Sequence, residues 1–157
     1  MAHVLLERML ADRGVDHGIR IRSGGIANYA RDGMLPSLDA RIVLRDEGID
    51  LDEAGLTSTD LKRHRHLLAE ADLILAMTAA QKVMLENFAE ARGRPVFTLS
   101  EFAGLDGDIE DPAMQGEQAF RYCCGVIKRS LEASLDRLIA TLSSEGGFAP
   151  LPNLPPG

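Results

Sequence analysis

The acidic loop Asp108-Ile109-Glu110-Asp111-Pro112 contains the residue types that most directly indicate chemistry. A carboxyl group held in a defined loop can protonate a leaving group and then accept a proton from water. Pro112 biases Asp111 away from helical geometry, which would project its carboxylate from the loop. The structural alternative is that Asp111 caps a helix with Pro112 at its first position, a common arrangement.

The elements that would position this loop alternate between helix and strand along the chain. Apolar periodicity, caps and glycine stops predict helices at 1–13, 36–48, 59–71, 78–93 and 117–142, and strands at 19–22, 73–77 and 96–99. The continuous apolar run Leu73-Ile74-Leu75-Ala76-Met77 is typical of a strand buried on both faces of a parallel sheet. The order predicts an α/β fold around a parallel sheet.

Composition indicates one globular domain without an extensive polyanion-binding surface. The 157 residues carry a formal net charge of −7, which argues against nucleic acid or anionic membrane as a partner. We expect a domain at 1–143 and a disordered Gly/Pro-rich tail at 144–157. The sequence shows no charged-then-apolar leader, and its apolar runs are much shorter than the roughly 20 residues that span a bilayer. We therefore predict a cytoplasmic protein. The adjacent Cys123 and Cys124 predict neither a disulfide nor a metal site.

The combined motifs resemble the low-molecular-weight protein tyrosine phosphatase family, which includes bacterial arginine phosphatases and related arsenate reductases. The resemblance covers nearly all of residues 1–143. It is carried by Met1-Ala2, Ser23-Gly24-Gly25, Gly48-Ile49-Asp50, Ala71-Asp72-Leu73-Ile74-Leu75-Ala76-Met77 and the acidic loop. It implies a three-layer sandwich around a parallel sheet, with four strands in the family and three expected in this chain.

The resemblance also implies a site. In the family a strand and a C-x5-R-[ST] nucleophile loop come directly before a Pro-Met-Ala that starts the first helix, and Met1 falls at that methionine. The nucleophile would therefore lie upstream, and the chain as given is expected to be inactive or nearly so. Asp111 would be the general acid, and Ser23 would support the nucleophile loop. The expected substrate is a phosphotyrosine or phosphoarginine protein, or a small phosphomonoester, with no metal or cofactor.

Two further features, an aromatic residue and a basic cluster, each have a functional and a structural interpretation. By the resemblance, Tyr29 would flank the substrate, where its ring could stack on a phosphotyrosine, but it could also be a surface loop residue. Lys62-Arg63-His64-Arg65-His66 could meet an anionic partner, although the solvated face of a helix is the simpler interpretation.

The string Cys123-x5-Arg129-Ser130 also satisfies C-x5-R-S, but it lies in the strongest helical pattern of the chain. Six residues of helix would separate Cys123 from Arg129 by about 9 Å along the axis and about 240° around it. Such a pair cannot enclose one phosphate, and helix-interior N–H groups are already bonded. We therefore predict that Cys124 packs in the core, with Cys123 beside it.

Departures from the family leave a second hypothesis open. The segment after Asp50 lacks the His and Arg found there in many members, and Ala113-Met114-Gln115-Gly116 replaces the tyrosines that follow the acid in eukaryotic members. The alternative is a catalytically dead phosphatase-like module with a binding or regulatory role. In either case, the absent strand would leave the strands at 19–22 and 73–77 with unpaired backbone, which predicts aggregation.

Overall fold

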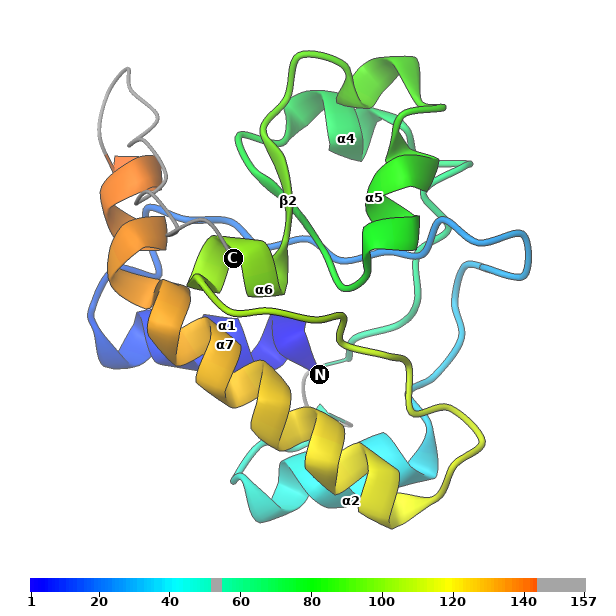
Figure 1. Ribbon diagram of the computed structural model, residues 1–157. Helices are drawn as coiled ribbons and strands as arrows, with labels where there is room; N and C mark the ends of the chain where they lie inside the picture. Colours follow the sequence, from blue (N-terminus) through cyan, green and yellow to red (C-terminus); the bar gives the residue numbers. More distant parts are fainter. Residues whose placement is uncertain (52–54, 144–157) are drawn as a thin grey trace.

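The computed structural model describes residues 1–51 and 55–143 (Figure 1). In chain order its elements are α1 (Ala2–Asp12), α2 (Leu38–Asp46), α4 (His66–Glu70), β1 (Ile74–Ala76), α5 (Ala79–Leu85), the 3-10 helix η1 (Ala89–Ala91), β2 (Val96–Thr98), α6 (Leu99–Ala103) and α7 (Glu117–Ser143). No helix in this described part is both long and apolar enough to cross a membrane. The predicted tail at 144–157 lies outside the described residues.

The sheet is parallel, as predicted for an α/β fold. β1 pairs with β2, with Ile74 opposite Val96 and Ala76 opposite Thr98. The expected third strand is wrong: within the described ranges the sheet has two strands, and residues 19–22 run without ladder pairing. Their alternating pattern still has a structural role, because Ile19 and Ile21 pack against the core cluster that includes Leu10 and Phe102. A strand needs a backbone partner as well as an apolar face.

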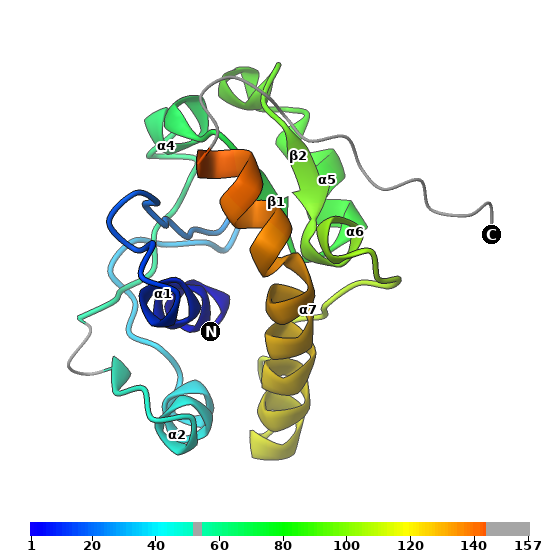
Figure 2. The same cartoon turned by 90° about the vertical axis from the view of Figure 1, so that its left-hand side faces the viewer.

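Helix α7 organises the core. It contacts α1, α2 and α6, and Figure 2 shows it between the α1–α2 pair and the half of the molecule that contains the sheet. Its buried stripe includes Cys124, Ile127 and Leu131, which pack against buried residues of α1 and α2. Residues spaced by three and four along one helix thereby hold both halves of the fold together.

Three predicted helices, 1–13, 36–48 and 117–142, are confirmed closely, whereas two are shorter than predicted. The segment 59–65 forms a bridge and turns, because the Asp60 carboxylate accepts the N–H of Lys62 at 3.0 Å and so favours a turn. The helix predicted to reach Gly93 ends at Leu85 and is followed by η1. Helix α6 was not predicted, and it begins at a capping box formed by Thr98 and Glu101.

Candidate active site

The acidic loop is anchored at the carboxyl end of β1. The Ile109 N–H donates to the carbonyl oxygen of Met77 at 2.9 Å, and Ile109 itself is buried. The Asp108 carboxylate accepts the N–H of Ala79, the first residue of α5, at 2.9 Å. This contact satisfies a free donor of α5 and places a negative charge at the positive end of its dipole. The loop is therefore fixed at the sheet edge where α/β proteins bind ligands.

Asp111 is exposed within this loop, next to the buried Pro112. Its carboxylate accepts the N–H of Ala113 at 3.0 Å, and its carbonyl accepts the side-chain amide of Gln115 at 3.1 Å. The alternative that Asp111 caps a helix is wrong, since the chain turns here and α7 begins only at Glu117. The carboxylate is held by a local turn and remains accessible.

The amino end of α1 and the first half of α7 meet next to Asp111. The thiol of Cys123 donates weakly to the Glu110 carbonyl at 3.7 Å. Burial raises the pKa of Cys123, the Met1 amine opposes this effect, and Asp111 adds to it. Burial also lowers the pKa of the Met1 amine. Met1 packs against the core cluster that contains Cys123, and Cys123 and Asp111 line the same groove.

Cys123 and Arg129 both lie within the continuous helix α7, as predicted. The Ser130 hydroxyl donates to the Val126 carbonyl at 2.9 Å, so it is also part of the helix rather than of a phosphate loop. Cys124 is buried, and burial raises its pKa. A thiol with a raised pKa is mostly protonated at neutral pH and is a poor nucleophile.

Ser23 is held by His3, a residue for which no role was predicted. His3 Nδ1 lies 2.7 Å from Ser23 Oγ, and His3 Nε2 lies 3.1 Å from Glu7 Oε1. The spacing of four between His3 and Glu7 was visible in the sequence and could have suggested this pair. The contact ties the Ser23-Gly24-Gly25 segment to the first turns of α1.

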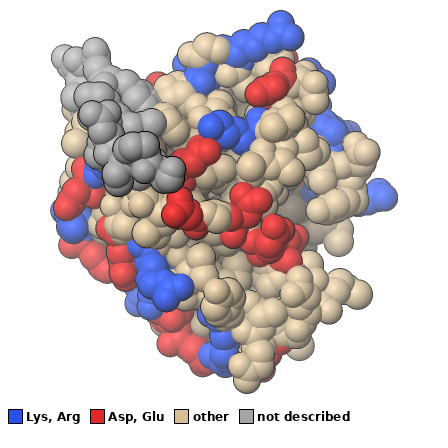
Figure 3. All heavy atoms as spheres, viewed as in Figure 1, with Lys and Arg blue, Asp and Glu red and all other residues tan. Residues whose placement is uncertain are grey.

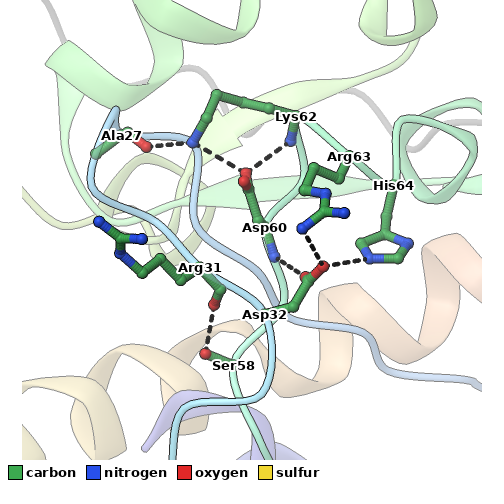
Figure 4. Close-up of polar contacts among 8 residues, drawn as sticks. All are labelled: Ala27, Arg31, Asp32, Ser58, Asp60, Lys62, Arg63 and His64. Atoms are coloured by element: carbon green, nitrogen blue, oxygen red, sulfur yellow. Dashed lines mark hydrogen bonds and ion pairs between the residues drawn. The ribbon is translucent and has the colours of Figure 1, made fainter.

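Tyr29 lies on an adjoining loop and is 78% exposed. A network of charged groups fixes this loop against the segment before α4 (Figure 4): Asp32 accepts the N–H of Asp60 at 2.7 Å and lies 3.0 Å from His64 Nε2. The Lys62 ammonium lies 2.9 Å from the Asp60 carboxylate and donates to the Ala27 carbonyl. The basic cluster is therefore not a helix face. Its first four residues precede α4, and three of them, Lys62, Arg63 and His64, contact this network.

The same contacts shift the pKa of both carboxyl groups. The backbone N–H of Asp60 and then the His64 ring lower the pKa of Asp32. The Lys62 side chain, more than any other group, lowers the pKa of Asp60. Both carboxylates are therefore ionised at neutral pH and hold the two loops together.

Comparison with known proteins identifies the family of the chain. The family model described as low molecular weight phosphotyrosine protein phosphatase matches residues 1–145. A protein-arginine-phosphatase of Geobacillus stearothermophilus is 35% identical over 130 residues, covering 82% of this chain and 80% of the relative. A probable low molecular weight protein-tyrosine-phosphatase EpsP of Ralstonia nicotianae is 32% identical over 143 residues, covering 89% and 87%.

Among solved structures, a YwlE arginine phosphatase superposes with a TM-score of 0.75 at 26% identity, covering 88% of this chain and 86% of its own. That structure is of a cysteine-to-serine mutant with a phosphorylated active-site serine. The fold, the anchored acidic loop and the family match lead to one conclusion: the chain belongs to the low-molecular-weight phosphotyrosine protein phosphatase family.

Proposed function

We propose that this chain supplies the acid-bearing part of a protein phosphatase that works through a cysteinyl-phosphate, with Asp111 as the general acid. The observation that carries the proposal is the fixed position of the acidic loop, bonded to Met77 at the end of β1 and to Ala79 of α5. The nucleophile would come from a C-x5-R-[ST] segment ahead of α1, since Cys123 and Arg129 are committed to α7.

The proposed reaction has two steps, and both use the cysteine and Asp111. The thiolate attacks phosphorus, and the bond from phosphorus to the substrate oxygen or nitrogen breaks while Asp111 gives its proton to that leaving atom. The Asp111 carboxylate then takes a proton from water, which attacks phosphorus and releases phosphate and the thiolate. The phosphorylated serine in the YwlE mutant supports a covalent step at the equivalent cysteine.

Phosphoarginine is the substrate that we favour. Ala113 and Met114 follow the acid where eukaryotic members have tyrosines, and Met114 is fully exposed. An arginine phosphatase is the relative with the highest identity among those described above. Phosphotyrosine is the second candidate, favoured by the exposed ring of Tyr29, which could stack on an aromatic substrate.

The decisive experiment compares the chain as given with the chain extended upstream through a C-x5-R-[ST] segment. Phosphate release from phosphoarginine and phosphotyrosine peptides should be absent from the first protein and present in the second, faster with phosphoarginine. An extended protein that folds cooperatively but releases no phosphate would support the non-catalytic module instead. Activity of the unextended chain that disappears with Cys123→Ser would contradict the assignment of the nucleophile.

A further inference from the structure

A groove of about 680 Å³ lies between the end of α6, the acidic loop and the first half of α7. We call it the α7 groove. Leu105, Val126 and Ala133 give it apolar walls, and Tyr122 lies along it. Leu105 is 45% exposed and Tyr122 is 75% exposed, so apolar surface is available to a ligand. Exposed apolar surface that is concave and bordered by charge is typical of an interaction site.

The border of the groove is strongly acidic. Asp106, Asp108, Glu110 and Asp111 line it, against the single guanidinium of Arg129. Acidic side chains gather over this loop in the centre of the face seen in Figure 3.

Three of these carboxylates are not neutralised by an ion pair among the described residues. Within the described part of the chain, no ion pair joins Asp106, Glu110 or Asp111 to a basic side chain. By contrast, Asp136 pairs with Arg13 at 2.8 Å elsewhere on α7. The charge of the groove is therefore available to a cationic partner, and the apolar walls are available to an uncharged part of the same partner.

We propose that the α7 groove docks a segment of the substrate protein in which arginine or lysine residues alternate with apolar residues. This rests on the proposed function, because Asp111 also lines the groove and a docked segment would lie beside the proposed general acid. The cationic side chains would contact Asp106 and Glu110, and the apolar ones would cover Leu105 and Tyr122. An acidic segment, or a second copy of this chain with its own acidic border, would be repelled.

The experiment measures binding and therefore needs no nucleophile. Two short fluorescein-labelled peptides, one alternating arginine with leucine and one alternating glutamate with leucine, are titrated with the chain at low ionic strength. The arginine peptide should bind and the glutamate peptide should not. The double variant Asp106→Lys/Glu110→Lys should weaken binding of the arginine peptide by about tenfold.

A matched variant separates the groove from the general negative charge of the protein. Asp16→Lys/Asp72→Lys makes the same change in net charge at exposed positions outside the groove and should keep most of the affinity. Equal weakening by both double variants, or equal binding of the two peptides, would overturn the proposal. Tyr122→Ser should also weaken binding, because apolar contact is part of it.

The two proposals can fail separately. If the extended protein hydrolyses phosphopeptides but the arginine-leucine peptide does not bind to the groove, the docking proposal alone is wrong. If the peptide binds as predicted but the extended protein is inactive, the docking proposal stands and the proposed reaction is wrong.

Discussion

At the residue scale, Asp111 is held by a turn of its own loop and keeps its carboxylate exposed. The Asp-Pro pair predicted a carboxylate held outside a helix, and the turn that contains Asp111 agrees with this. The contact of His3 with Ser23 was not predictable, because it joins residues 20 positions apart through the packing of α1. The local sequence predicts backbone conformation, whereas contacts between side chains of different elements depend on the fold.

In the extended protein, Asp111→Asn should lower kcat by about 10²- to 10⁴-fold, the usual contribution of a positioned general acid. The fold should be unaffected, because the side chain is exposed and the amide keeps its acceptor oxygen. Steady-state kinetics with a phosphoarginine peptide tests this, with Asp16→Asn, at an exposed position outside the α7 groove, as the control. A fall of similar size in the control would refute the assignment.

Asp60 should contribute to stability in a pH-dependent way. Its carboxylate is buried and contacts the Lys62 ammonium, which lowers its pKa. Its contribution is therefore complete above the unfolded pKa of about 3.9 and is lost as the pH falls through the lower folded pKa. Urea denaturation should show Asp60→Asn less stable than the native chain at neutral pH, with the difference shrinking below about pH 4. Asp16→Asn should show no such pattern.

At the scale of elements, a cap residue marked the start of one correctly predicted helix. Ser37 was visible as a start of α2, and its hydroxyl accepts the N–H of Ala40 at 3.3 Å. Helix α6 was not predicted because Thr98 both ends β2 and caps α6, and five residues are too few to show a repeated apolar pattern. The strand predicted at 19–22 failed for a different reason, because its pairing depends on a neighbour that no local pattern specifies.

The capping box of α6 supplies a prediction at this scale. Thr98 Oγ1 accepts the N–H of Glu101 at 3.0 Å, and Glu101 Oε2 accepts the N–H of Thr98 at 2.9 Å. Thr98→Ala should therefore lower the free energy of unfolding by about 1 kcal/mol, whereas Thr98→Ser, which keeps the hydroxyl, should cost less. Thermal denaturation of both variants measures the difference, and equal losses would show that the cap contributes little.

For the whole molecule, the sheet is the feature with the widest consequence. β1 pairs with β2 along one edge, and within the described residues its other edge has no strand partner. The class of fold followed from alternating elements, but the number of strands did not, because ladder formation depends on the complete set of neighbours.

An unpaired edge predicts self-association. The chain as given should elute as oligomers or aggregates in size-exclusion chromatography, whereas the upstream-extended protein should be monomeric and melt at a higher temperature. A monomeric, cooperatively melting chain without the extension would show that the β1 edge is satisfied in another way.

The burial of the two cysteines offers a way to test for the proposed upstream nucleophile. Cys123 and Cys124 are the chain's two cysteines, and burial raises the pKa of both thiols. In the folded protein they should react slowly with iodoacetamide, which modifies thiolates. Alkylation of an extended protein should therefore stop at one label per molecule if a single added cysteine is the nucleophile. If inorganic phosphate slows the labelling of that cysteine, the reaction can be used to count active sites.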